Sequence, residues 1–391
     1  MRDKVSQDTG EIIYLDGAST SLNRPPCVGE AVCRALGSFG SDGRGTHDAS
    51  LAASRTVFRT RQKIGEMFGL SDPSRVVFTS GATESLNIAI SGLVRPGKHA
   101  VSTVLEHNSV LRPLYLQESR GASLSFAGCD VKGRVLPSDI EERIRPETVL
   151  VVCTHVSNVT GNRTDIEAIG EICRRRGVLF LVDAAQSAGF FPINMREMKI
   201  DLLCFSGHKG LMAPQGTGCL LVREGIAIPP FKVGGTGVQS FLRSQPAEMP
   251  TALEAGTLNG HGIAGLLAAL QYIEDTGIGV IRRKADALAR RFFLGVGSVE
   301  GVTVYGDTDE PDRAPIVSLN LAGRDSAEIS DALERRYRIY TRAGVHCAPL
   351  LHESLGTGES GAVRFSFSHM NTEAQTDAAI AAIRELAGES I

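Results

Sequence analysis

A lysine, an aspartate and a glycine-containing turn each follow an apolar run in this sequence. Lys209 lies in SGHKG (206–210), directly after the apolar residues 201–205. Asp183 follows the run 178–182, so its carboxylate is expected to be buried, and a buried carboxylate needs a cationic partner. The turn SGAT (80–83) leads from a third run into a helix, whose N-terminal amides suit a phosphate group. Each feature alone also has an ordinary interpretation, because lysines on turns are usually solvated and Thr83 could be a plain N-cap.

Together these features indicate one cofactor. Pyridoxal 5'-phosphate requires an amine that binds it, a carboxylate for its protonated ring nitrogen and a seat for its phosphate. No other common cofactor needs all three. The SGAT turn is not a Walker loop, because no GK[ST] follows it. The eight cysteines include no CxxC pair, so we expect no metal site.

The elements that must position these residues are short apolar runs, which we expect to be strands. They lie at 76–79, 100–104, 149–153, 178–182 and 201–205, and helical patterns at 84–93 and 165–176 alternate with them. This alternation predicts βαβ units in a mainly parallel sheet. The run 218–222 follows too closely for a helical crossover, so we expect it to be antiparallel. Ligands bind at the carboxyl ends of such strands. The polar side chains that follow the runs include Glu106, His107, His155, Ser157, Asn158, Gln186, Ser206 and His208.

The sequence changes character after about residue 255. Helical patterns at 263–275 and 279–296 lead to alternating strands at 315–321 and 362–368 and to a last helix at 372–388. A helix period also covers 50–69, ahead of the first strand. We therefore predict a large α/β domain over 15–254 and a smaller α+β domain over 255–391, with residues 1–14 packing near the smaller one.

Composition excludes several classes of protein. The 391 residues are 42% hydrophobic and 22% charged, as in ordinary globular proteins, and the net charge of -3 gives no electrostatic case for nucleic acid or a membrane. The polar N-terminus does not resemble a signal peptide, and no apolar stretch is long enough to span a membrane. We expect a cytoplasmic protein with reduced cysteines.

The motifs resemble those of class V aminotransferases, a family of fold-type I pyridoxal phosphate enzymes. Within that family they are similar to the group II cysteine desulfurases and selenocysteine lyases. The resemblance runs from about residue 12 to the last helix, through IYLDGAST (13–20), SGATESLN (80–87), EHNSVLRP (106–113), HVSNVTG (155–161), VDAAQSAG (182–189), SGHKG (206–210), EAGTLN (254–259) and RAGVHCAP (342–349). It implies a mainly parallel seven-stranded sheet with a smaller α+β C-terminal domain.

The resemblance also implies a role for each matching residue. Lys209 would bind the cofactor as a Schiff base, Asp183 would pair with the pyridine nitrogen, His107 would stack on the ring and Gln186 would bond its phenolic oxygen. The groups that would hold the phosphate are Gly81, Ala82, Thr83, Ser206, His208 and, from a neighbouring subunit, Thr257. Asn158 would contact both cofactor and substrate, and the substrate carboxylate would lie at Arg342 and Arg364. Such sharing implies a homodimer.

Cys347 would select the reaction. It follows the Arg-x-Gly-x-His stem directly, and the resemblance implies that it removes sulfur from cysteine, or selenium from selenocysteine, as a persulfide that passes to an acceptor protein. The product would be alanine. An ordinary loop thiol is the alternative interpretation of this cysteine.

Other reactions remain open at this point. Elimination from a cysteine S-conjugate would give pyruvate, ammonia and a thiol without Cys347, and another class V aminotransferase reaction is a third alternative. Three segments differ from the usual pattern of the family and leave the substrate undecided: Gly17 with Ser19-Thr20, residues 43–47 and residues 350–367.

Overall fold

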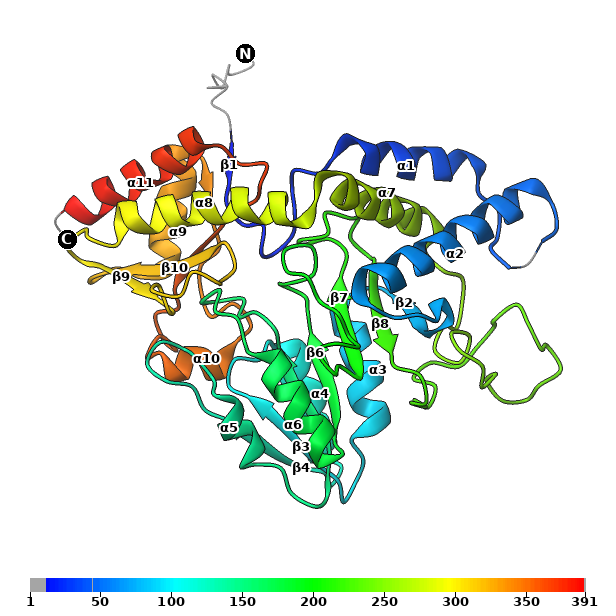
Figure 1. Ribbon diagram of the computed structural model, residues 1–391. Coiled ribbons are helices and arrows are strands. Elements are labelled where there is room, and N and C mark those ends of the chain that lie inside the picture. The colour runs from blue at the N-terminus through cyan, green and yellow to red at the C-terminus, as the bar shows by residue number, and fades with distance from the viewer. Residues whose placement is uncertain (1–11, 44, 390–391) are drawn as a thin grey trace, which may run out of the picture.

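The computed structural model describes residues 12–43 and 45–389, in which three sheets are surrounded by helices (Figure 1). The largest sheet has seven strands in the order β2-β8-β7-β6-β5-β3-β4. These strands are β2 (Val76–Thr79), β3 (His99–Thr103), β4 (Ser123–Ala127), β5 (Thr148–Thr154), β6 (Leu179–Asp183), β7 (Leu202–Ser206) and β8 (Gly218–Val222). All pairs among β4, β3, β5, β6 and β7 are parallel, whereas β8 is antiparallel to both β7 and β2. The mainly parallel sheet and its one reversed strand are therefore confirmed.

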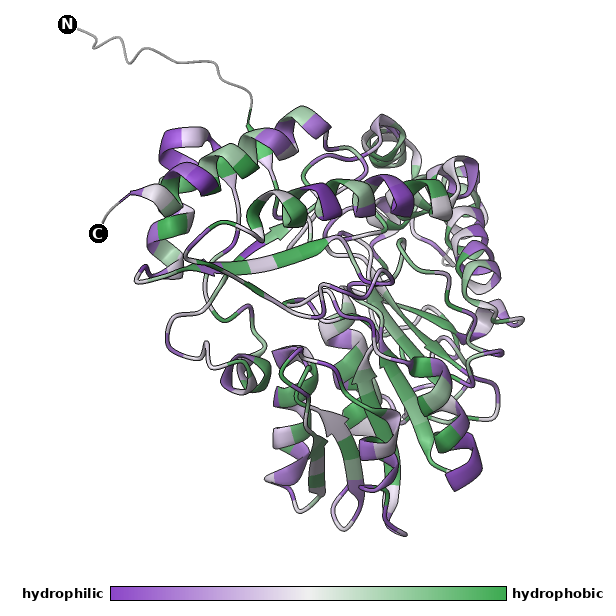
Figure 2. Ribbon diagram, turned by 60° about the vertical axis from the view of Figure 1, so that its left-hand side comes forward, coloured by the Kyte–Doolittle hydropathy of each residue, from purple (hydrophilic) through white to green (hydrophobic). Residues whose placement is uncertain are grey.

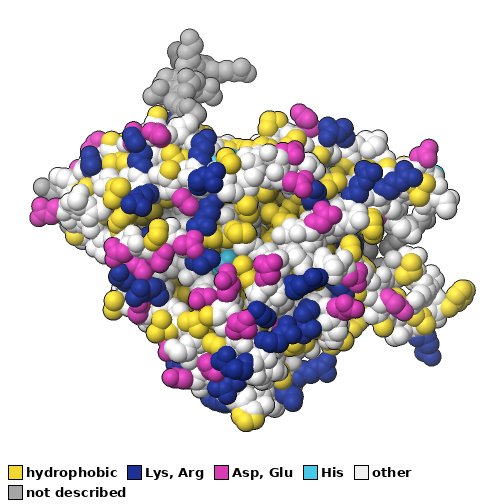
Figure 3. Space-filling model, in the orientation of Figure 1, with side chains coloured by type: hydrophobic (Ala, Val, Ile, Leu, Met, Phe, Trp, Pro, Cys, Tyr) yellow, Lys and Arg dark blue, Asp and Glu magenta, His cyan; other side chains and the backbone are white. Residues whose placement is uncertain are grey.

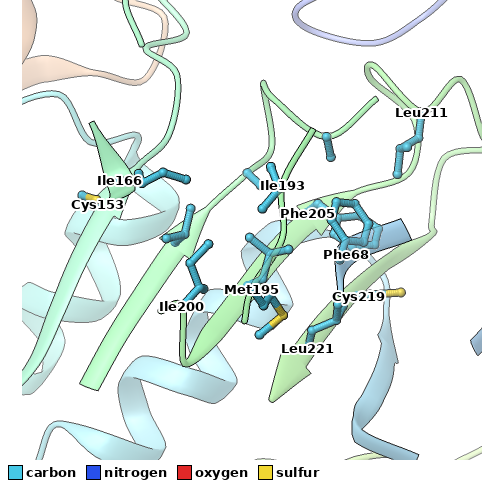
Figure 4. Close-up of a cluster of buried hydrophobic side chains, with 14 of the residues drawn as sticks. Phe68, Cys153, Ile166, Ile193, Met195, Ile200, Phe205, Leu211, Cys219 and Leu221 are labelled. Carbon is cyan, nitrogen blue, oxygen red and sulfur yellow. The ribbon is translucent and has the colours of Figure 1, made fainter. Parts of the chain in front are cut away.

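Helices cover both faces of this sheet. One face packs against α3 (Ala82–Leu93) and α4 (Asn108–Glu118). The other packs against α1 (Pro26–Ser38), α2 (Asp48–Phe68), α5 (Pro137–Glu141), α6 (Ile166–Arg176) and α7 (Gly260–Thr276). Successive residues of β2 face opposite clusters, Val76 and Phe78 with the second set of helices and Val77 with the first. Figure 4 shows part of the larger cluster, where Phe68 of α2 lies beside Phe205 of β7.

A three-stranded antiparallel sheet forms a second core. Its order is β12-β10-β9, with β9 (Val302–Tyr305), β10 (Ile316–Leu321) and β12 (Val363–Ser366). Its apolar partners come from α8 (Ile278–Val296), α9 (Ser326–Tyr337) and α11 (Glu373–Gly388). The short β1 (Ile13–Tyr14) pairs with β11 (Ile339–Tyr340), and Leu15 lies in this second core. The remaining helix α10 (Pro349–Ser354) and the 3-10 turn Pro73–Arg75 connect these elements.

The helix α8 joins the two cores. Its first turns supply Ile281 to the large cluster, and Leu288 and Phe292 belong to the smaller one. The division into domains at 254 and 255 stays a prediction. Of its N-terminal segment, residues 1–11 lie outside the described residues.

Several elements differ from the sequence expectations. The predicted helices at 84–93 and 50–69 begin at Ala82 and Asp48, and the sequence patterns named neither β4 and β9 nor the helices α1 and α9. The strand β4 reads SLSFA and lies at the edge of the sheet, where its partly exposed serines break the apolar signal.

The surface is mixed in charge. On the face in Figure 3, acidic and basic side chains are interspersed, and Figure 2 shows the hydrophobic residues concentrated on the strands between the helices. No helix among residues 12–43 and 45–389 combines the length and the apolar character that crossing a membrane requires.

Candidate active site

The predicted site residues meet where three neighbouring parallel strands end. β6 ends at Asp183, which lies opposite Thr154 of β5 and Cys204 of β7. Ser206 ends β7 opposite Gly218 of the reversed strand β8. Because parallel strands present their carboxyl ends at one edge, the side chains that follow them gather there.

Burial sets the chemistry of Asp183 and Lys209. Asp183 is 4% exposed, and one of its oxygens accepts a hydrogen bond from the Ala185 amide at 2.9 Å. Burial raises the pKa of this carboxyl, while the Ala185 amide and Lys209 lower it. Burial also lowers the pKa of Lys209 to about 8, against the attraction of Asp183. In the described part of the chain the Lys209 amine donates no hydrogen bond. An amine and a carboxylate are thus held close to one another without a direct bond.

The SGAT turn packs closely against β7 and β8. The Ala82 amide donates to Ser206 Oγ at 2.9 Å. A Cβ on Gly218 would lie 2.4 Å from the Gly81 Cα, so the turn and the strand leave no room for a side chain. Gly81 caps α3 without a side-chain hydrogen bond, so no capping side chain stands between the start of the helix, with Ser206 beside it, and an anion.

Thr83 and His107 are linked through Ser109. The Thr83 hydroxyl lies 2.8 Å from that of Ser109, and the Ser109 amide donates to His107 Nδ1 at 3.0 Å. His107 is the N-cap of α4, and burial together with nearby cations lowers its pKa to about 4. The ring is therefore neutral at neutral pH, which suits stacking on another ring. Sequence reasoning missed Ser109, although it lies within the EHNSVLRP motif.

His208 and Gln186 contact the segment around residue 20. His208 Nδ1 lies 3.0 Å from Thr20 Oγ1, and Gln186 Nε2 donates to the Ala18 carbonyl at 3.0 Å. Burial lowers the pKa of His208 to about 4. The backbone of Lys209 is held by Ser21 Oγ, which donates to its carbonyl at 2.8 Å.

Glu106 lies next to His107 in the chain, at the ends of β3 and β5, and had no predicted role. It is fully buried, and its Oε1 accepts from Thr103 Oγ1 at 2.7 Å and from the Thr154 amide at 3.1 Å. Burial raises its pKa to about 8, with Asp183 acting in the same direction and the hydrogen bonds opposing it. The side chain is therefore a neutral acid at neutral pH.

Arg364 and Arg342 are neighbours across a backbone bridge. The Arg364 amide donates to the Arg342 carbonyl at 2.8 Å. Arg364 is 1% exposed; its Nη1 donates to the Asn158 carbonyl at 3.0 Å and its Nη2 pairs with Asp16 Oδ1 at 2.9 Å. Asp16 is a partner that the motif assignment did not include.

Cys347 lies in a loop with unusual backbone angles. Both His346 and Cys347 have positive φ, 50° and 57°, a conformation that costs about 1–3 kcal/mol each for residues with side chains. The Asn108 amide, next to His107, donates to the Cys347 carbonyl at 2.7 Å, and Arg342 Nη2 lies 3.6 Å from its Sγ. Asn158 Nδ2 donates to the His346 carbonyl at 2.8 Å. The loop is therefore held against the same edge of the sheet as the lysine.

Thr257 is the predicted residue that stands apart. It is exposed, and among the described residues its side chain has no hydrogen-bond partner. Glu254, three residues before Thr257, is held in place. Its carboxylate accepts hydrogen bonds from Arg61 Nη1 at 2.8 Å and from the Phe78 amide at 2.6 Å.

The arrangement fits pyridoxal phosphate. Asp183 is buried and one of its carboxylate oxygens accepts from the Ala185 amide, so the other oxygen suits a protonated ring nitrogen. The unbonded Lys209 amine suits an aldehyde. The close turn at Gly81, with Ser206 beside it, suits a phosphate. Among the described residues, no group of three His, Cys, Asp or Glu side chains could hold a metal ion.

Comparison with known proteins agrees with this geometry. The family described as Aminotransferase class-V matches residues 13–378. A probable cysteine desulfurase of Methanothermobacter thermautotrophicus is 32% identical over 383 residues, which cover 96% of this chain and 95% of that protein. The cysteine desulfurase IscS of Vibrio campbellii is 35% identical over 391 residues, covering 95% and 92%.

Solved structures agree as well. The apo structure of a cysteine desulfurase from Thermococcus onnurineus NA1 superposes with a TM-score of 0.91 at 34% identity, covering 96% of this chain and 94% of that one. The cysteine desulfurase CsdA of Escherichia coli gives a TM-score of 0.86 at 27% identity, covering 96% and 94%. The chain belongs to the class V aminotransferases, and it is therefore a pyridoxal phosphate-dependent enzyme.

Proposed function

We propose that this enzyme is a cysteine desulfurase, which converts cysteine to alanine and takes up the sulfur on Cys347. The observation that carries the proposal is the place of the Cys347 thiol. It lies 3.6 Å from the Arg342 guanidinium, and its charge is among those that act on the Lys209 amine. The names of the similar proteins support the same reaction.

Lys209 and Asp183 would carry the first half of the reaction. The bound cofactor would supply an electron sink for the bond that breaks at the substrate α-carbon. The Lys209 amine, with its pKa lowered to about 8, can accept the α-proton near neutral pH. Asp183 would keep a proton on the ring nitrogen, His107 would hold the ring from one face and Gln186 would bond its oxygen.

The substrate carboxylate would lie at Arg364, Arg342 and the Asn158 amide. Two guanidinium groups meet there with the single carboxylate of Asp16, so the pocket retains one net positive charge. The remaining groups, Gly81, Ala82, Thr83, Ser206 and His208, would hold the cofactor phosphate, with Thr257 of a second subunit.

The sulfur transfer step conserves atoms and electrons. The Cys347 thiolate attacks the substrate sulfur, the new S–S bond forms as the Cβ–S bond breaks, and the carbon fragment keeps the electron pair of that bond. After protonation this fragment leaves as alanine. The persulfide on Cys347 passes its outer sulfur to the thiol of an acceptor, which we propose to be a protein. Selenocysteine would enter the same site.

A second copy of the chain would complete the site. The loop 229–245 carries apolar side chains that a monomer leaves exposed to solvent, and Phe241 is fully exposed. They are Phe231, Val233, Val238, Phe241 and Leu242. Together with the exposed Thr257, this loop favours a homodimer with shared sites.

Product analysis tests the proposed function. Cofactor-loaded enzyme incubated with cysteine and a reducing thiol should give alanine and sulfide in equal amounts, and Cys347 should gain the mass of one sulfur when the thiol is left out. Cys347→Ser should lose alanine production, whereas Cys33→Ser, which changes an exposed cysteine on α1, should keep it. Pyruvate from an S-alkyl cysteine with Cys347→Ser still active would instead indicate a β-lyase. A requirement for an α-keto acid would indicate an aminotransferase.

A further inference from the structure

Ser19 joins the two arginines of the substrate site through one hydroxyl. Arg364 Nη2 donates to Ser19 Oγ at 2.7 Å, and Arg342 Nη1 donates to the same oxygen at 3.2 Å. Ser19 Oγ in turn donates to Asp16 Oδ1 at 2.7 Å. Residues more than 300 positions apart in the chain therefore share one oxygen atom.

The direction of these bonds is forced. Guanidinium groups only donate, and an ionised carboxylate only accepts. Ser19 must therefore give its single proton to Asp16 and use both lone pairs for Arg364 and Arg342. Its three hydrogen-bonding sites are filled, so the hydroxyl cannot rotate without breaking a charge-assisted bond.

The two arginines depend on Ser19 to different extents. Arg364 is buried and keeps Asp16 and the Asn158 carbonyl without it. Arg342 is less buried, and apart from Ser19 its described side-chain contact is the Cys347 Sγ at 3.6 Å. The guanidinium that faces the thiol is thus the one that Ser19 holds in place.

We propose that Ser19 is a positioning residue that holds the Arg342 guanidinium beside the Cys347 thiol and couples it to the carboxylate-binding Arg364. A cation at this distance stabilises the thiolate that attacks the substrate sulfur. The assignment of the thiol and the carboxylate rests on the proposed function, whereas the Ser19 network itself rests on the hydrogen bonds above.

Alkylation of Cys347 tests the proposal directly. Cofactor-loaded enzyme without substrate is treated with iodoacetamide at pH 7, and modification of the Cys347 peptide is followed by mass spectrometry. Ser19→Ala should slow modification about three- to tenfold, the size of a charge interaction about 4 Å from a solvated thiolate. Ser19→Thr, which keeps the hydroxyl, should restore most of the rate, and Ser119→Ala, an exposed serine at the end of α4, should leave it unchanged.

A double variant separates positioning from an unrelated structural effect. If Ser19 acts through Arg342, Ser19→Ala should slow alkylation no further in an Arg342→Gln background. In steady-state assays with cysteine, kcat should then fall more than KM changes, because Arg364 keeps its other partners. Unchanged alkylation in folded Ser19→Ala, or additive effects of the two substitutions, would overturn the proposal. Absence of alanine production by the unsubstituted enzyme would refute the proposed function instead, and it would leave the alkylation comparison intact.

Discussion

At the scale of single residues, burial decides which groups in this site carry charge. Burial lowers the pKa of Lys209 by more than the attraction of Asp183 raises it. Burial also raises the pKa of Glu106 and so favours its neutral form. His107, which a solvent-exposed position would leave partly protonated near pH 6.5, is neutral here. Above about pH 8 the site therefore presents a free amine where an exposed lysine would stay charged, and the His107 ring is neutral at the pH where an exposed histidine titrates.

The lowered pKa of Lys209 predicts the pH dependence of cofactor loading. The neutral amine is the reactive form, so its fraction rises with pH and levels off above about 8. The rate of covalent attachment of pyridoxal phosphate to apo protein, trapped by borohydride and measured on the Lys209 peptide, should follow this curve. An ordinary lysine would continue to gain rate up to about pH 10.4. Lys209→Ala should show no attachment at this position, and a profile that still rises at pH 10 would refute the assignment.

Glu106 predicts a pH dependence of stability. Its folded pKa of about 8 lies above the unfolded value of 4.5, so the stability it contributes is complete below pH 4.5 and is lost as the pH rises to about 8. Glu106→Gln removes this loss, because an amide does not ionise, and its oxygen can still accept from Thr103 and Thr154. From pH 5 to pH 8 the stability of the variant relative to the unsubstituted protein should rise by roughly 3–4 kcal/mol, because each pKa unit corresponds to about 1.4 kcal/mol. Urea unfolding at both pH values measures the difference, and a gain that is equal at both would contradict it.

At the scale of elements, the Cys347 loop is fixed by a buried chain of hydrogen bonds to α10. His346 Nε2 lies 3.0 Å from the Arg342 carbonyl, and its Nδ1 lies 3.2 Å from His352 Nε2. His352 Nδ1 lies 2.7 Å from Thr357 Oγ1. Because the Arg342 carbonyl only accepts, the assignment that satisfies every atom has His346 donating to it, His352 donating to His346 and Thr357 donating to His352. Burial lowers the pKa of both rings, that of His346 to about 2, so the chain is neutral.

This chain predicts the stability cost of changing α10. His352→Leu leaves His346 Nδ1 buried without a donor and should destabilise the fold by about 1–3 kcal/mol. Thr357→Val should cost less, because it removes only the last donor of the chain. Urea unfolding of both variants, and of the double variant, gives the order and the coupling. A larger cost for Thr357→Val than for His352→Leu would show that the bonds run differently.

The sequence patterns located the strands that precede Asp183 and Lys209, but they did not indicate the partners of Arg364. The runs before Asp183 and Lys209 are apolar because both faces of the sheet are covered, so the residues that follow them could be recognised from composition alone. Asp16 and Ser19 reach Arg364 from 348 and 345 positions away, and no local pattern signals such a contact. The edge strand β4 was missed for a related reason, since its exposed serines interrupt the apolar run that marks buried strands.

At the scale of the whole molecule, the exposed Thr257 and the apolar loop 229–245 predict sites shared by two subunits. Lys209→Ala and Thr257→Asp should each abolish or strongly reduce activity, the second by placing a negative charge at a phosphate. Mixed dimers should then regain one intact site, because it takes Lys209 from one chain and Thr257 from the other. Refolded equal mixtures should recover about a quarter of the unsubstituted activity. Mixtures no more active than their parents would show that each chain holds a complete site, and light scattering gives the oligomeric state independently.

The reversed strand β8 has a consequence for the order in which the molecule assembles. The paired strands β7 and β8 are separated in the chain only by the turn that carries Lys209, so their pairing closes a short loop. Arg364, by contrast, pairs with Asp16, which lies 348 positions away in the chain. Closing a long loop costs more chain entropy, and contacts of this kind form late in folding. We expect the lysine turn to acquire protection from hydrogen exchange during refolding before the backbone bridge of Arg342 and Arg364 does. A chain stalled between these stages would hold the lysine turn and lack the arginine pair that binds the substrate.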